Sequence, residues 1–127
     1  IRFARVELMK RFLSTIRRSQ DGKIAWGFLR RGDLTESGAV KTDMEGFVNY
    51  MRDIEGVSIA IFAFDPEEDG TVKISLRAKM DADVNTIAAY FDGGGHAKAA
   101  GCSSRGSVED VLQRIITKAE EHIRSVS

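Results

Sequence analysis

The chain is poor in the residues on which much protein chemistry depends, since its 127 residues include one cysteine and two histidines. The single cysteine, Cys102, excludes an internal disulfide and fits a reducing compartment, so we expect a cytoplasmic protein. No apolar run approaches the ~18 residues of a membrane span, and no signal-peptide pattern opens the chain. Basic and acidic side chains balance at nineteen each, which argues against a mainly electrostatic nucleic-acid binder.

Metal ligands are scarce as well. His96 and His122 lie in different segments, and the sequence contains no His-x-Glu or Cys-x-x-Cys grouping. A catalytic zinc needs about three protein ligands, and a two-metal hydrolase needs several carboxylates and imidazoles held together. Only His96 lies near Cys102 in the sequence, so a Cys–His pair has a single candidate. We therefore expect no self-contained metal site for hydrolysis within this chain.

The length suits one domain, because domains centre on about 100–150 residues. The chain begins with Ile1 rather than methionine, so we expect a piece of a longer protein. Strand and helix patterns alternate along it, which predicts an α/β fold with a single mixed β-sheet covered by helices and an N-terminal linker helix.

The N-terminal segment, residues 2–18, predicts an amphipathic helix with one apolar stripe. The stripe consists of Phe3, Val6, Met9, Phe12, Leu13 and Ile16. The same segment has six basic residues and one acidic residue. Two interpretations stay open: a solvated basic face, or a connecting helix that packs on a missing upstream domain or lies near a polyanion.

Three further helices are predicted from capping signals. Thr42 and Glu45 have capping-box spacing ahead of a helical pattern that stops near Gly56. Asp83 can cap the next helix, and Ser107 followed by Asp110 opens the last one. The inward residues predicted for the last helix are Val108, Val111, Leu112, Ile115, Ala119 and Ile123.

The strands have shorter patterns. Residues 24–29 and 57–64 are apolar runs of strand length, whereas residues 71–79 alternate apolar and polar side chains. The turn residues 66–70 join the last two into a hairpin. Residues 32–42 are polar and contain glycine, so we expect a loop there.

A run of three glycines, Gly93 to Gly95, ends in His96. Consecutive glycines are costly in backbone entropy and suit a chain that needs positive φ or a close backbone approach. Such a turn exposes successive N–H groups that can bind an anion. The small residues of 97–100 predict a short helical turn, whose first N–H groups would also face a phosphate. The alternative is a flexible loop with one exposed histidine.

Arg77 lies on the polar face of the strand 71–79, two residues from Ser75. A guanidinium group there is able to bind a phosphate through two hydrogen bonds. The alternative is an ordinary solvated strand face. Sequence spacing does not show whether Arg77 and His96 meet.

The block Gly93-Gly94-Gly95-His96 with Ala99-Ala100-Gly101 resembles the C-terminal DHH-associated domain of the DHH phosphoesterase superfamily. Further matching segments are Ser75-Leu76-Arg77, Asp83-Val84-Asn85, Glu45-Gly46-Phe47-Val48-Asn49 and Ile54-Glu55-Gly56-Val57, so that the resemblance spans roughly residues 24–123. The Ala99–Cys102 ending is most similar to the nanoRNase/pAp phosphatases, which degrade very short oligoribonucleotides and adenosine bisphosphate.

This resemblance implies a two-domain enzyme with a division of labour. Residues 1–20 would be a linker helix from a missing N-terminal catalytic domain that binds two manganese ions. Residues 21–127 would be the DHH-associated substrate-binding domain, without metal or catalytic residues and inactive alone. The implied partners are short single-stranded RNA or nucleotide phosphates and the N-terminal DHH domain in cis, with no membrane and with a homodimer left open.

The resemblance also implies roles for individual residues. Gly93, Gly94, Gly95 and His96 would form the phosphate or nucleotide loop, while Arg77 with Ser75 would contact substrate phosphate. Asn49 lies in a family motif without an assigned role. Asp92 stands where relatives more often have a further glycine, which would make the start of the loop stiffer.

Alternatives to this assignment remain. The same domain occurs in cyclic-dinucleotide phosphodiesterases and in RecJ-type single-strand exonucleases. A non-catalytic RNA-binding module, like the related C-terminal part of alanyl-tRNA synthetases, is a different class, but those relatives tend to replace the histidine that is His96 here. A dimerisation domain with an incidental glycine loop is the last alternative.

Overall fold

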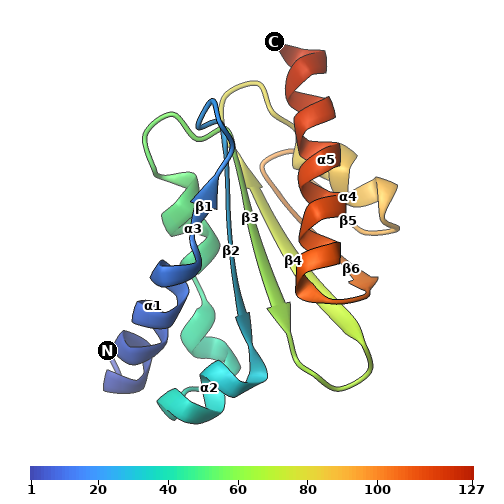
Figure 1. Cartoon of the computed structure of the whole chain (residues 1–127). Coiled ribbons are helices and arrows are strands. Elements are labelled where there is room, and N and C mark those ends of the chain that lie inside the picture. The colour runs from blue at the N-terminus through green and yellow to red at the C-terminus, as the bar shows by residue number, and fades with distance from the viewer.

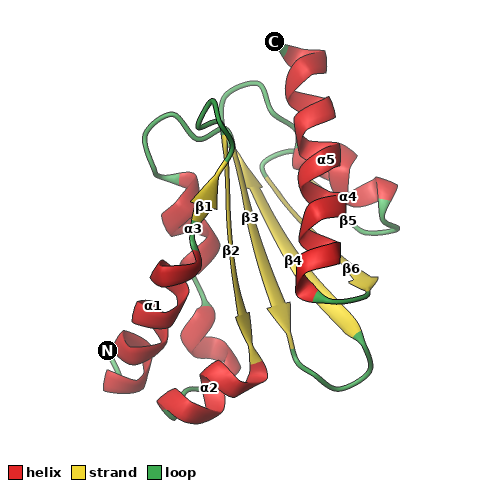
Figure 2. Cartoon of the chain, viewed as in Figure 1, coloured by secondary structure: helices red, strands yellow, loops and turns green.

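The centre of the molecule is one six-stranded mixed sheet, in a computed structural model that describes all residues 1–127. The strands are β1 (Arg17–Arg18), β2 (Ile24–Arg30), β3 (Ile59–Asp65), β4 (Thr71–Ala78), β5 (Gly94–His96) and β6 (Ala99–Arg105). The helices are α1 (Phe3–Thr15), α2 (Arg31–Ser37), the 3-10 helix η1 (Lys41–Met44), α3 (Phe47–Arg52), α4 (Val84–Tyr90) and α5 (Val108–Val126). The predicted α/β class, with one mixed sheet and an N-terminal helix, is confirmed (Figures 1 and 2).

The strands lie in the order β1-β2-β3-β4-β6-β5. Only β2 and β3 are parallel, and the crossover between them contains α2, η1 and α3, because parallel neighbours cannot be joined by a tight turn. The predicted hairpin is confirmed as β3 and β4, and a second hairpin, β5 with β6, forms the far edge of the sheet. None of the helices is both long and apolar enough to cross a bilayer.

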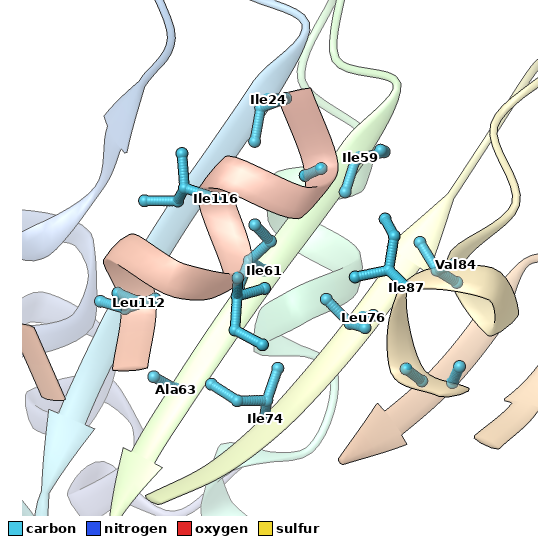
Figure 3. Close-up of a cluster of buried hydrophobic side chains, with 14 of the residues drawn as sticks. Ile24, Ile59, Ile61, Ala63, Ile74, Leu76, Val84, Ile87, Leu112 and Ile116 are labelled. Atoms are coloured by element: carbon cyan, nitrogen blue, oxygen red, sulfur yellow. The ribbon is translucent and has the colours of Figure 1, made fainter. Parts of the chain in front are cut away.

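Helices cover both faces of the sheet, with α1, α2 and α3 on one side and α4 and α5 on the other (Figure 1). Successive residues of β3 alternate between the two cores, so that Ile61 faces α5 and Phe62 faces α1. Figure 3 draws part of the core beneath α4 and α5, where Leu76 of β4 lies beside Ile87 of α4. The two-sided burial explains why 57–64 has a continuous apolar pattern.

The two capping signals in the second half of the chain are confirmed. The carboxylate of Asp83 accepts hydrogen bonds from the backbone N–H groups of Asn85 (2.9 Å) and Thr86 (3.3 Å), at the start of α4. The Ser107 hydroxyl accepts one from the N–H of Asp110 at 3.1 Å, at the start of α5. All the inward residues predicted for α5 are buried.

The predicted helix 2–18 is too long. It ends at Thr15, whose hydroxyl accepts a hydrogen bond from the N–H of Phe28 at 3.0 Å. The chain then becomes extended, and Arg17 pairs with Trp26 in β1. The local sequence does not predict this end of the helix, because the helix ends where Thr15 contacts a strand that comes later in the chain.

The predicted apolar stripe of α1 is also partly wrong. The buried residues of the helix are Leu8, which the stripe omitted, and Phe12. Phe3, Val6 and Leu13 are instead exposed by 73%, 43% and 40%. The helix therefore has a second apolar face that nothing in this chain covers.

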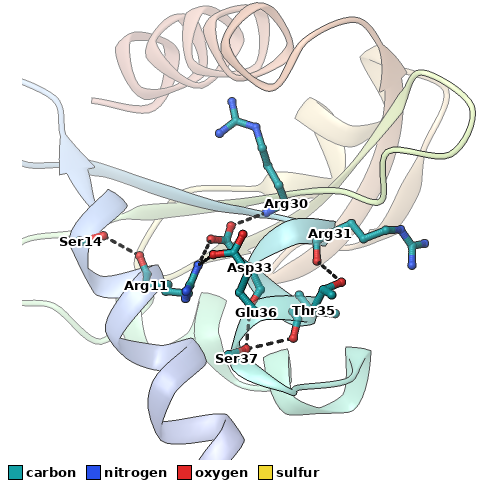
Figure 4. A network of polar contacts seen from close by, with 9 residues as sticks. Arg11, Ser14, Arg30, Arg31, Asp33, Thr35, Glu36 and Ser37 are labelled. Atoms are coloured by element: carbon teal, nitrogen blue, oxygen red, sulfur yellow. Dashed lines mark hydrogen bonds and ion pairs between the residues drawn. The ribbon is translucent and has the colours of Figure 1, made fainter.

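The predicted loop 32–42 contains α2 and the start of η1 (Figure 4). Asp33 in the first turn of α2 accepts a hydrogen bond from the N–H of Arg30 at 2.8 Å. Arg11 of α1 contacts both Asp33 (3.3 Å) and Glu36 (3.1 Å), and these contacts raise the pKa of Arg11, with Glu36 as the larger cause. The polar segment is thus capped by its own Asp33, buries Leu34, and pairs with an arginine 22 residues earlier.

The predicted Thr42–Glu45 capping box is absent. The carboxylate of Asp43 accepts the N–H of Val40 at 2.9 Å, which starts η1. That hydrogen bond, together with the nearby Arg2 guanidinium, lowers the pKa of the Asp43 carboxyl. The following helix, α3, begins only at Phe47, after Gly46 adopts a positive φ of 89°.

Candidate functional site

The face of the sheet that holds α1 and α3 is covered only in part. Phe62 and Phe64 of β3 are buried beneath the helices, with exposed fractions of 6% and 5%. On the same face of the neighbouring strand, Ser75 and Arg77 are only partly buried and Lys73 is exposed. The open part of this face therefore runs from β4 across β6 to β5.

The strand register brings Arg77 and His96 onto this open face. Arg77 of β4 pairs with Ala99 of β6, and Ala99 pairs in turn with His96 of β5. Residues directly opposite in antiparallel strands point to the same side. Two strand spacings separate the Cα atoms of Arg77 and His96 by about 10 Å. The juxtaposition that the sequence left open is therefore present in the backbone, with only the small Ala99 between the two side chains.

Arg77 is held in place by Asn49, for which the sequence suggested no role. The Arg77 Nε–H donates to the amide oxygen of Asn49 at 3.1 Å, and one Nη donates to the carbonyl oxygen of Leu76 at 2.9 Å. A guanidinium has five N–H donors, so three remain free. Asn49 comes from α3, on the crossover before β3, and no sequence spacing could have linked it to β4.

The charge of Arg77 is not neutralised by the chain. It belongs to none of the ion pairs in the structure. Partial burial lowers its pKa, and the nearby Arg52 guanidinium lowers it further. Arg52 donates to the same Asn49 oxygen at 3.4 Å while it pairs with Asp53 at 2.9 Å. A partly desolvated cation beside a second cation favours an anionic ligand.

The glycines of the run have different structural roles. A Cβ on Gly93 would lie 2.2 Å from the carbonyl oxygen of Gly101, and one on Gly95 would lie 2.6 Å from that of Ala99. Both positions therefore need glycine so that β5 can lie against β6. A Cβ on Gly94 would make only an ordinary contact of 3.7 Å with the Asn85 side chain, and the residue is exposed, so this position does not require glycine. Asp92, just before the run, adopts a φ of 62°, a left-handed conformation that favours glycine.

The predicted helical turn at 97–100 is wrong, because Ala97 and Lys98 are the two-residue loop of the β5–β6 hairpin. The carbonyl of Ala97 accepts the N–H of Val84 at 2.8 Å, and Lys98 Nζ donates to the carbonyl of Ala82 at 2.7 Å. The hairpin end is thus fastened to the start of α4. His96 stands exposed on an edge strand, where unpaired backbone groups are also available.

A groove of about 390 Å³ lies next to Arg77, between the crossover and β4. Besides Arg77 and Ser75, its lining includes Lys41, Met44, Val48, Phe62, Phe64 and Lys73. Its floor is apolar and its rim is mainly basic, a combination that suits a flat base with an attached phosphate. The glycine hairpin is not part of this lining, so the structure divides the predicted site residues between the groove and the neighbouring strand edge.

The other candidate residues do not form a metal site or a catalytic pair. Nowhere in the chain do three or more His, Cys, Asp or Glu side chains gather as a metal centre. Cys102 pairs with Ile74, which faces the α5 core, so the thiol lies on the other side of the sheet from the His96 side chain. Burial raises the pKa of the Cys102 thiol to about 11. A thiol of this kind is a poor nucleophile at neutral pH.

Comparison with known proteins identifies the family of the chain. Residues 21–125 match the family model described as the DHHA1 domain. The chain is similar to the bifunctional oligoribonuclease and PAP phosphatase NrnA of Thermus thermophilus, with 30% identity over 98 residues. The matched segment is 76% of this chain and 30% of that protein, so the chain spans about a third of its relative's length.

Solved structures share the fold. A crystal structure of an exopolyphosphatase-related protein from Bacteroides fragilis superposes with a TM-score of 0.88 and 29% identity, over 99% of this chain and 37% of that one. The pGpG-specific phosphodiesterase PggH of Vibrio cholerae superposes with a TM-score of 0.56 and 14% identity, over 91% of this chain and 38% of that one. The second similarity extends to the fold alone.

Proposed function

Because this chain belongs to the DHHA1 domain family and resembles the nanoRNase/pAp phosphatases, we propose that it is the substrate-binding lobe of a phosphoesterase that hydrolyses short oligoribonucleotides and pAp. The phosphate of the substrate binds the free donors of Arg77, assisted by the Ser75 hydroxyl. The nucleotide then lies toward β5, against Gly94 and His96, with Gly93 and Gly95 shaping the hairpin.

One observation supports this proposal above the others. Arg77 is oriented by Asn49, lacks an acidic partner, and lies in register with His96 across a small residue. On an ordinary solvated strand face, we would expect the arginine side chain to point into solvent, without a partner residue that fixes its orientation. Small residues between the two side chains leave room for a phosphate and a sugar on the sheet surface.

The catalytic centre belongs, in this proposal, to an N-terminal DHH domain in cis. When bound there, manganese would supply an activated water and charge stabilisation at the scissile phosphate. This lobe positions the substrate and excludes solvent, and the isolated chain is inactive. Residues 1–20 link the two domains, and the uncovered apolar face of α1 with Phe3, Val6 and Leu13 suits contact with the upstream domain.

The experiment that tests the proposal uses the full-length parent protein with Mn²⁺. Turnover of a ribodinucleotide, pAp, a cyclic dinucleotide and a long single strand is compared at equal enzyme concentration. We expect preference for the dinucleotide and pAp. Preference for the cyclic dinucleotide or the long strand would instead identify a cyclic-dinucleotide phosphodiesterase or a RecJ-type exonuclease, and binding without turnover of any substrate would favour an RNA-binding module.

A matched pair of variants tests the assigned phosphate contact in the same assay. Arg77→Gln should lower kcat/KM on the preferred substrate at least tenfold, because a charge-assisted bidentate contact is lost. Arg124→Gln removes the same charge from the exposed side of α5 and should leave kcat/KM within twofold. Equal effects of the two substitutions would overturn the assignment.

A further inference from the structure

We infer that the groove beside Arg77 is a second-nucleotide subsite, which lets the protein hold a dinucleotide more tightly than a nucleoside monophosphate. The inference rests on the proposed function, because it starts from a first phosphate at Arg77. The residues that would form the subsite are Lys41 and Lys73 at its rim and Val48, Phe62 and Phe64 at its floor.

The position of the groove sets the size of ligand that can use it. Lys73 and Arg77 lie on one face of β4, four residues apart, with Ser75 between them. At about 3.3 Å per residue, their Cα atoms are separated by about 13 Å. A chain of two nucleotides anchored at Arg77 is long enough to extend along β4 to Lys73.

The charge of the groove favours an anionic chain. Lys41 and Lys73 are exposed, and neither belongs to any of the ion pairs in the structure. The acidic residue of the lining is Glu45, so the groove keeps a net positive charge when Arg77 is included. Two unpaired lysines on opposite walls can contact the backbone phosphate of a second nucleotide from both sides.

The floor supplies an apolar surface for a base. Phe64 lies directly opposite Lys73 in the register of β3 and β4, and Phe62 lies opposite Ser75. Each phenylalanine is buried beneath the helices except for a small part that lines the groove. The small exposed parts of these rings give a base an apolar contact without hydrogen-bonding groups that would distinguish one base from another. The subsite therefore distinguishes substrates by their length rather than by their base sequence.

The test measures the dissociation constants of pApA and AMP for the full-length parent protein, in a chelating buffer so that pApA is not hydrolysed. The double variant Lys41→Gln with Lys73→Gln should weaken pApA binding five- to tenfold and leave AMP binding within twofold, because AMP has no second phosphate. The matched control is the double variant Lys23→Gln with Arg124→Gln, which removes the same two charges from exposed positions outside the groove and should alter neither constant. Phe62 and Phe64 are left unchanged because their substitution would disturb the core.

The outcomes separate this inference from the proposed function. If the double variant binds pApA as the unmodified protein does, or loses affinity for AMP and pApA equally, the subsite is refuted. Arg77→Gln, measured alongside, should weaken both ligands at least tenfold. If Arg77→Gln leaves both dissociation constants unchanged, the proposed phosphate site itself is wrong.

Discussion

The contact between Asn49 and Arg77 allows a substitution that should strengthen the fold while it weakens the function. Asn49→Asp keeps an oxygen acceptor at 3.1 Å from Arg77 Nε and at 3.4 Å from the Arg52 guanidinium. It also adds a negative charge between these two cations. The resulting ion pairs should leave the free energy of unfolding unchanged or raise it by up to about 1 kcal/mol. The same carboxylate should repel a phosphate bound at the free donors of Arg77.

The size of that repulsion follows from the geometry. A phosphate on the far side of the guanidinium would lie about 7 Å from the Asn49 oxygen, given ordinary hydrogen-bond lengths. Two unit charges at that separation interact by about 0.6 kcal/mol at the dielectric constant of water and by about 2.4 kcal/mol at an effective value of 20. These energies correspond to roughly three- to sixtyfold weaker binding, and we expect about tenfold for a half-exposed site.

The assay is pAp binding to the full-length parent protein by calorimetry, with stability followed by urea denaturation. Asn49→Ala serves as the comparison, because it loosens Arg77 without adding charge and should weaken binding and stability together. The affinity loss in Asn49→Asp should shrink as salt is raised, since screening reduces it. If Asn49→Asp binds pAp as tightly as the unmodified protein, the phosphate does not bind at Arg77.

Three more predictions follow from the hairpin and from the cysteine. His96→Ala in the parent protein should lower kcat/KM for a ribodinucleotide by about ten- to a thousandfold, and a change of less than twofold would contradict its role. Gly93→Ala should lower the free energy of unfolding by about 1–3 kcal/mol because its Cβ would collide with backbone, whereas Gly94→Ala should leave stability unchanged and weaken nucleotide binding. The Cys102 thiol, whose pKa is raised to about 11, should react slowly with iodoacetamide at pH 8 and faster only as pH approaches 11; rapid reaction at pH 8 would contradict its burial.

Local patterns predicted much of the fold, where a segment's structure depends on its own neighbours. The alternation in 71–79 and the cap at Asp83 are signals of this kind, and both are confirmed. The segment 31–37 shows another case, because its polar composition indicated a loop, whereas its helix has contacts from elsewhere in the chain, the ion pairs of Asp33 and Glu36 with Arg11. The exposed side of α1 shows a third case: Phe3 and Val6 fit an apolar stripe by spacing, yet the sheet contacts Leu8 and Phe12 instead.

The predicted site residues were found by type and by family motif, and the structure adds how they are arranged. Arg77 and His96 are 19 positions apart, and their alignment depends on β6 returning between β4 and β5, which spacing does not encode. Asn49 is farther still, at 28 positions from Arg77. The glycine run had a local signal, but Gly93 and Gly95 are required by the approach of β6. The backbone N–H groups of residues 93–95 are therefore less available to a phosphate than those of a glycine-rich turn would be.

The packing role of Gly93 and Gly95 determines which groups are left to bind a phosphate in this fold. With Gly93 and Gly95 occupied in packing, the positive charge must come from side chains on the neighbouring strand, and Arg77 is the one that lacks an acidic partner and has a fixed direction. A guanidinium held from α3 and a histidine held on β5 belong to separate segments of the chain. Binding between them therefore depends on the sheet staying intact from β4 to β5. Substitutions that loosen β5, such as Gly95→Ala, should for that reason reduce affinity even though they remove no contact to the ligand.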